Sequence, residues 1–122
     1  MSVVLLRHAS AGDRAEWVGD DRLRPLDPRG RRQAAKLVAP LLELGVTRVL
    51  SSSYVRCVQT VEPLAEALGV ELELDERLAE GAGRAAALEL FENLDDAVAC
   101  THGDIVEEVL GNSLKKGRYA LL

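Results

Sequence analysis

Short apolar runs alternate along this chain with longer stretches in which apolar positions recur every three or four residues. The runs at 3–6, 46–51 and 97–101 are mainly aliphatic, which predicts strands buried on both faces, as in a parallel sheet. The segment 70–74 alternates between apolar and acidic residues, which predicts a half-exposed strand near an edge of the sheet. Residues 118–122 are also strand-like.

The longer stretches between these runs have the spacing of amphipathic helices. A helix is predicted at 28–44, with Asp27 as its N-cap. We expect Pro40 to kink this helix and Pro63 to divide the next one. Further helices are expected at 85–94 and from 103 to about 110. The alternation of strands and helices over 122 residues predicts one α/β domain, residues 1–122, with a mostly parallel central sheet.

Charged and polar residues follow three of the predicted strands. Arg7 and His8 come directly after the first, Arg56 lies shortly after a serine cluster that ends the second, and His102 follows the run at 97–101. Both histidines of the chain therefore occupy the same kind of position. Because open α/β sheets bind ligands outside the carboxyl ends of their strands, these side chains are expected to meet at one edge and to suit an anionic ligand.

Four segments carry a resemblance to a known family. They are residues 6–9 (LRHA), 52–60 (SSYVRCVQT), 77–80 (RLAE) and 101–103 (THG). In this order they resemble the motifs of the histidine phosphatase (phosphoglycerate mutase-like) superfamily. Within it the short chain is most similar to SixA-type phosphohistidine phosphatases, and also to the phosphatase domain that some bacterial proteins carry behind a Nudix domain. The resemblance implies a three-layer α/β/α sandwich.

The resemblance also implies how the strand-end residues work. His8 would be the nucleophile and form a covalent phosphohistidine, with its other ring nitrogen held by a carbonyl near Ala9. Arg7 and Arg56 would bind the phosphoryl oxygens, and His102 would donate a hydrogen bond to the same group. From the residues alone the two histidines are nearly equivalent. No metal or other cofactor is expected, because the arginines supply the positive charge.

Other residues are expected to assist. The resemblance makes Glu80 the general acid, with Glu76 as a nearby alternative. Ser52, Arg24 and Gly103 are expected to contact the substrate. Two further arginines of the same polar loop, Arg14 and Arg22, are interpreted instead as solvated. The buried-looking contexts of Cys57 and Cys100 predict small core residues rather than a disulfide.

Composition limits the partners. The net charge of −5 argues against nucleic acid and anionic membrane surfaces. The opening apolar run is too short for a signal peptide, and no stretch approaches the roughly 20 apolar residues of a membrane helix. We therefore expect a cytoplasmic protein. Family members usually continue through one more strand or hairpin, so the last strand is expected to be cut short.

The substrate stays open at this level. A phosphohistidine protein, as in SixA-type enzymes, is the first expectation, and a nucleotide or other small phosphate ester is the alternative. A mutase is disfavoured, because the chain has no room for the insertion that encloses a bisphosphate. A different class, a non-catalytic phosphate-binding module, is the second alternative, although the intact set of Arg7, His8, Arg56 and His102 argues against it, because a binding module has no use for a nucleophile.

Overall fold

A computed structural model describes residues 3–122, which form five strands, four α-helices and three single-turn 3-10 helices. The strands are β1 (Val3–Arg7), β2 (Arg48–Ser51), β3 (Leu72–Leu74), β4 (Ala97–Thr101) and β5 (Tyr119–Leu121). The α-helices are α1 (Pro28–Glu43), α2 (Val55–Leu68), α3 (Arg84–Phe91) and α4 (Gly103–Leu110). The 3-10 helices are Arg14–Glu16, Asp21–Leu23 and Glu76–Leu78.

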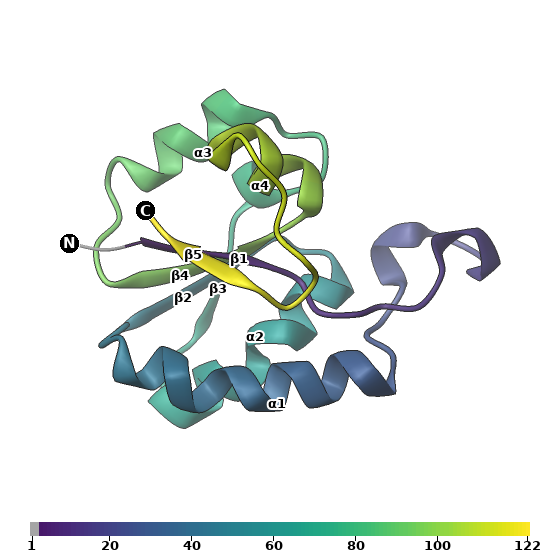
Figure 1. The fold of residues 1–122 in the computed structure, drawn as a ribbon, viewed down its shortest axis with the longest axis horizontal. Coiled ribbons are helices and arrows are strands. Elements are labelled where there is room, and N and C mark those ends of the chain that lie inside the picture. The colour runs from purple at the N-terminus through teal and green to yellow at the C-terminus, as the bar shows by residue number, and fades with distance from the viewer. Residues whose placement is uncertain (1–2) are drawn as a thin grey trace.

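The strands form one sheet in the order β3-β2-β4-β1-β5, in which only β5 is antiparallel to its neighbour. Helices α1 and α2 cover one face, and α3 and α4 cover the other (Figure 1). The three-layer α/β/α sandwich with a mostly parallel sheet is therefore confirmed. None of the helices within residues 3–122 is both long and apolar enough to cross a membrane.

The core is aliphatic and divided by the sheet. Val4 and Leu6 of β1 pack on the side of α1 and α2, whereas Val3 packs on the side of α3. This separation follows from the two-residue period of a strand, which sends successive side chains to opposite faces. Cys57 and Cys100 are buried and free, as predicted.

The structure corrects several predicted boundaries. The division of the second helix at Pro63 is wrong, since α2 runs unbroken from Val55 to Leu68. A proline removes one backbone donor, but Val61 and Leu64 beside it are buried in the core, and this packing keeps the helix whole. Helix α3 ends at Phe91 rather than 94, and β2, β3 and β5 are each shorter than their apolar runs.

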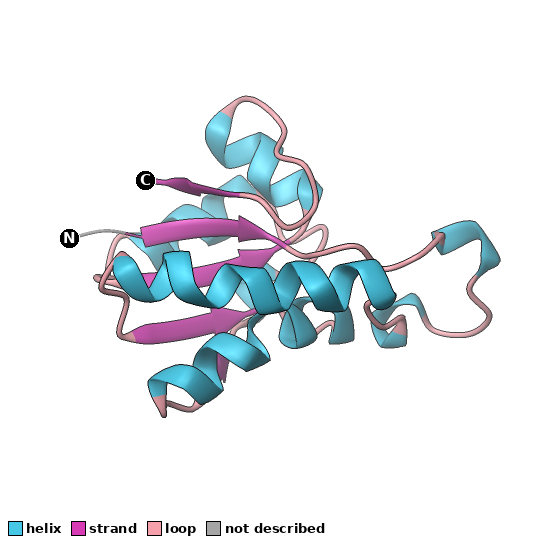
Figure 2. Ribbon diagram, turned by 60° about the horizontal axis from the view of Figure 1, so that its bottom comes forward, coloured by secondary structure: helices cyan, strands magenta, loops and turns pink. Residues whose placement is uncertain are grey.

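Two local contacts shape the entry to α1. The Asp27 carboxylate accepts a hydrogen bond from the Gly30 amide (2.7 Å), which confirms the predicted N-cap. Gly30 itself packs against the first loop, because a Cβ atom at this position would lie 1.9 Å from the Ser10 carbonyl oxygen. Only glycine allows α1 to approach the segment after β1 this closely. The long loop between β1 and α1 projects beyond the sheet at the end to which the β1 arrow points (Figure 2).

Candidate active site

The strand register brings the predicted site residues together. In the parallel pair β1–β4, Arg7 stands opposite Thr101, so His8 and His102 each follow the last paired residue of adjacent strands. Ser52 follows β2 on the other side of β4 in the same way. The ring centroids of His8 and His102 are 5.5 Å apart, with the rings steeply inclined to each other. Both histidines therefore lie next to each other at the carboxyl ends of the two central strands β1 and β4.

His8 is held in one tautomer. Its Nδ1 atom lies 2.8 Å from the Ala9 carbonyl oxygen. Since a carbonyl can only accept, the proton is on Nδ1 and the lone pair is on Nε2. The Ala9 amide donates in turn to Thr60 Oγ1 (3.0 Å), and the Thr60 hydroxyl donates to the Arg56 carbonyl (2.7 Å). The predicted carbonyl contact is thus present, and it leaves Nε2 available as a nucleophile.

Burial also keeps the His8 ring neutral. Its side chain is only 5 % exposed, and burial lowers its pKa from the usual 6.5 to about 3. The hydrogen bond to the Ala9 carbonyl opposes this decrease in pKa, while electrostatic interactions with His102, Arg56 and Arg7 add to it. An imidazole without a proton on Nε2 is the form that can attack phosphorus.

We expect this buried neutral ring to make stability depend on pH. Between about 6.5 and 3 the unfolded chain binds a proton on His8 and the folded protein does not. Stability is therefore highest above pH 6.5 and falls toward pH 3, by about 1.4 kcal/mol per pH unit. Urea unfolding at several pH values measures this slope, which His8→Asn should reduce. Equal slopes in both proteins would contradict a neutral buried His8.

The His102 ring is held through Nε2, whereas the His8 ring is held through Nδ1. Its Nε2 atom lies 2.9 Å from Ser52 Oγ and 3.5 Å from Cys57 Sγ. The Tyr54 amide donates to Ser52 Oγ (3.3 Å), which leaves the serine hydrogen free to point at Nε2; in that arrangement the ring proton of His102 is on Nδ1. This Nδ1 atom is buried and has no hydrogen-bond partner within residues 3–122. Ser52 is fully buried and does not line the cavity, so its contact with Nε2 orients the His102 ring.

Two arginines flank the histidines. Arg7 donates from Nη1 to the Leu114 carbonyl (2.7 Å). Gly103 lies against the Arg7 guanidinium, where an added Cβ would come within 2.9 Å of Cζ, so glycine makes room for it. The fully buried Arg56 donates from Nη1 to the Asp21 carbonyl (2.9 Å), and its Nη2 lies 3.2 Å from the Asp21 carboxylate. In the described chain, the Nε atoms of Arg7 and Arg56 are buried without a partner.

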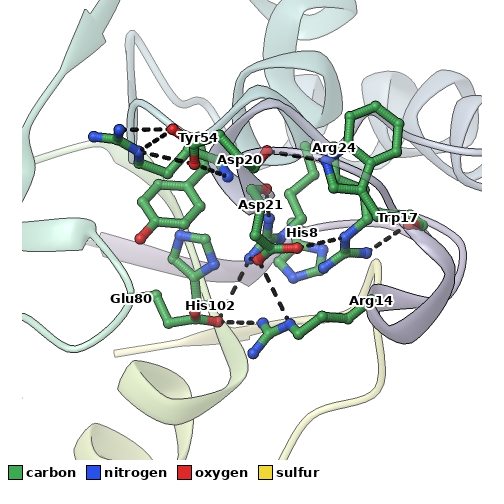
Figure 3. Close-up of polar contacts among 12 residues, drawn as sticks. His8, Arg14, Trp17, Asp20, Asp21, Arg24, Tyr54, Glu80 and His102 are labelled. Atoms are coloured by element: carbon green, nitrogen blue, oxygen red, sulfur yellow. Dashed lines mark hydrogen bonds and ion pairs between the residues drawn. The ribbon is translucent and has the colours of Figure 1, made fainter.

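Glu80 stands at the same site. Its Oε1 atom lies 2.6 Å from Arg14 Nη2 and 3.5 Å from Arg56 Nη2 (Figure 3). The next residue, Gly81, donates from its amide to Asp104 Oδ2 (2.8 Å), which ties the Glu80 loop to the start of α4. Glu76 is exposed and does not line the cavity. Between the two acids considered from the sequence, the geometry favours Glu80.

The polar loop contributes more than its sequence indicated. Asp21 lies 2.8 Å from Arg24, 3.2 Å from Arg56 and 3.5 Å from Arg14. One carboxylate therefore organises three guanidinium groups. Arg14, interpreted from sequence as solvated, lines the cavity and bonds Glu80. The only available signal was the mixture of acidic and basic residues in the loop, which does not reveal which of them pair.

These groups surround a cavity of about 420 Å³. Five predicted residues, Arg7, His8, Arg24, Glu80 and Gly103, line it, together with Arg14 and with Lys116 from the segment before β5. Arg56 and His102 stand directly behind this lining, in contact with Glu80 and His8 respectively. Across residues 3–122, no three histidine, cysteine, aspartate or glutamate side chains gather as a metal site. Asp104 and Glu107 also line the cavity, so four cationic and three acidic side chains surround the neutral imidazole of His8.

Sequence comparisons agree with the motifs. A family model described as histidine phosphatase superfamily (branch 1) matches residues 3–104. The chain is 40% identical over 112 residues to a protein of Mycolicibacterium smegmatis named 8-oxo-(d)GTP phosphatase, covering 86% of this chain and 35% of that protein. It is 33% identical over 85 residues to a Shigella dysenteriae protein named "Probable phosphoglycerate mutase GpmB". This match covers 66% of this chain and 38% of that protein. The chain therefore spans little more than a third of these relatives.

Solved structures show the same fold. A protein histidine phosphatase SixA complexed with tungstate superposes with a TM-score of 0.74 and 21% identity, over 100% of this chain and 94% of that one. A mycobacterial glucosyl-3-phosphoglycerate phosphatase gives a TM-score of 0.82 at 17% identity, over 99% and 89%. At these identities the likeness concerns the fold alone. The family model covers all four motifs that meet at the sheet edge, and the chain belongs to the histidine phosphatase superfamily.

Proposed function

We propose that this protein hydrolyses phosphate monoesters through a covalent phosphohistidine on His8, with no metal ion. The observation that carries the proposal is a set of three buried nitrogen atoms without partners in the described chain: Arg7 Nε, Arg56 Nε and His102 Nδ1. Leaving a buried donor unsatisfied costs about 1–3 kcal/mol. A phosphoryl group bound above His8 would satisfy all three and would receive positive charge where its own negative charge is greatest.

The reaction proceeds in two balanced steps. The lone pair on His8 Nε2 attacks phosphorus, the bond to the leaving oxygen breaks, and that oxygen takes the electron pair and a proton from Glu80. Water then attacks the phosphohistidine, Glu80 takes a proton from it, and the electrons of the P–N bond return to Nε2. Arg7, Arg56 and His102 neutralise the equatorial oxygens throughout. Phosphoramidates and aryl esters, whose leaving groups are good, depend least on Glu80.

A trapping experiment tests this chemistry. We expect turnover of p-nitrophenyl phosphate to persist in EDTA. Rapid quenching with a 32P-labelled ester should yield labelled protein that is stable in alkali and labile in acid, as a phosphohistidine is. Tight phosphate binding without any labelled protein would contradict the proposal and favour the non-catalytic phosphate-binding module. Turnover abolished by EDTA and restored by a divalent cation would contradict the metal-independent mechanism.

Two substrate classes follow from the sequence, and one observation favours the second. A phosphohistidine protein is the substrate expected by analogy with SixA, but the 21% identity supports only a shared fold. A nucleotide is favoured by the 40% identity, over 112 residues, to the protein named 8-oxo-(d)GTP phosphatase. Comparing turnover of a nucleotide with that of a phosphohistidine peptide distinguishes the two classes.

A further inference from the structure

We propose that a shallow apolar groove beside the cavity binds the planar base of a nucleotide, with Trp17 as the stacking surface, while the phosphate of the same ligand lies at His8. The inference rests on the proposed function and deepens it by naming the substrate class. We call this surface the Trp17 groove. It has a volume of about 260 Å³, and its apolar walls are Ala11, Trp17, Pro25 and Leu26.

The Trp17 groove is continuous with the cavity. Gly12 and Arg24 line both. An added Cβ at Gly12 would meet no atom within 4 Å, so the space around Gly12, at the border of the two hollows, is open. Because the two hollows adjoin, they suit a ligand with one anionic end and one planar apolar end. A nucleotide has this shape, with the phosphate and base at opposite ends of the sugar.

Trp17 is fixed in place although it is partly exposed. It is the single tryptophan of a chain with 3% aromatic residues, and the residue is 38 % exposed. The indole Nε1 donates to the Asp20 carbonyl (2.9 Å), and the backbone amide donates to the Arg14 carbonyl. Figure 3 shows the indole beside Arg24 at the outer end of the site. A rigid exposed aromatic ring is suited to stacking, because binding costs it little conformational freedom.

Charge sets the direction in which a ligand binds. Arg24 is buried, with its Nε bonded to Asp21 (2.8 Å) and its Nη1 to the Ala11 carbonyl (2.5 Å). Within residues 3–122 these contacts use Nε and Nη1 of Arg24, a residue that lines both the cavity and the groove. Asp13 and Glu16 border the groove and repel an anion. The phosphate is therefore drawn to the arginines, and an uncharged base is accepted beside Trp17.

The experiment compares two substrates that differ only in the base. GMP and ribose 5-phosphate share the phosphate and the ribose, so the ratio of their kcat/KM values reports the contribution of the base. We expect Trp17→Ala to lower this ratio about tenfold, mainly through KM, since stacking on an aromatic side chain is commonly worth about a factor of ten or more. Trp17→Phe, which keeps an aromatic face, should retain much of the preference. Val18→Ala is the matched control, because Val18 is 90 % exposed on the same loop but does not line the groove.

Binding is measured separately from turnover. In the His8→Ala protein, GMP should change the fluorescence of the single tryptophan, whereas inorganic phosphate should change it little. This change in fluorescence would support the Trp17 groove as a base-binding site. If the wild-type protein nevertheless hydrolysed no ester, only the proposed function would fail. Hydrolysis of p-nitrophenyl phosphate with a GMP preference that Trp17→Ala leaves intact would overturn the groove and leave the proposed function standing. If Trp17→Ala lowered turnover of a phosphohistidine peptide but not of GMP, that result would also overturn the proposed Trp17 groove.

Discussion

Replacing His8 with alanine is expected to lower kcat for any phosphate ester by a factor on the order of 10⁵. The substitution removes the only group at the base of the cavity whose free nitrogen lone pair faces the substrate in the proposed mechanism. His8 Nδ1 is bound to the Ala9 carbonyl, so Nε2 is the atom that forms the covalent bond. The measurement is single-turnover hydrolysis of p-nitrophenyl phosphate, together with the yield of labelled phosphoenzyme.

His102→Ala is the matched comparison, since both imidazoles are buried at the same sheet edge. Loss of a hydrogen-bond donor to the phosphoryl group should cost about 10²–10³ in kcat, and some phosphohistidine should still form. Vanadate binding to the His8→Ala protein checks that the arginines remain in place. Phosphoenzyme formed by His8→Ala but absent from His102→Ala would reverse the two assignments.

Arg56→Lys is expected to reduce kcat/KM by about 10²–10³, or about 3–4 kcal/mol of transition-state stabilisation, although it keeps the positive charge. The terminal nitrogens of the Arg56 guanidinium group contact Asp21 and Glu80, and its Nε atom has no partner within residues 3–122 and is available to the ligand. A lysine has one nitrogen on a flexible stem and does not reproduce three directed contacts. Steady-state kinetics with the aryl ester measure the loss.

The control for Arg56→Lys is Arg48→Lys. Arg48 pairs with Glu73 on the exposed surface (2.6 Å), away from the cavity, so its replacement should leave kcat/KM within about twofold, as is usual for an exposed pair. Thermal unfolding of both variants separates a catalytic loss from misfolding. A folded Arg56→Lys protein with wild-type kinetics would remove Arg56 from the phosphoryl site.

Much of the site was predictable because strand ends are local features. An apolar run followed by Arg7 and His8, and a second run followed by His102, place these side chains at the carboxyl edge of any parallel sheet that the runs form. The family motifs then assigned roles to Arg56 and Glu80. Helix caps such as Asp27 were also predictable, since a cap depends on residues three positions apart.

The remaining features depend on contacts between segments far apart in the chain. Asp21 meets Arg56 only because the first loop folds back over α2, whereas its partners Arg24 and Arg14 belong to the same loop. Ser52 was expected to contact the substrate, but it is buried, lies in hydrogen-bonding distance of His102 from the next strand and does not line the cavity. The predicted division of α2 at Pro63 does not occur. Residues beside Pro63 are buried in the core, and burial of this helix face outweighs the loss of one backbone hydrogen bond.

The sequence by itself determined the fold class, the family and the residues that stand at the ends of strands, because apolar periodicity and short motifs are properties of neighbouring residues. Only the tertiary structure decided which nitrogen of each histidine is free, which carboxylate holds the arginines and where Trp17 lies relative to the phosphate cavity. These depend on distances between atoms that the chain brings together from separate elements, such as the 2.9 Å from His102 to Ser52 across fifty positions. No local pattern encodes such a distance.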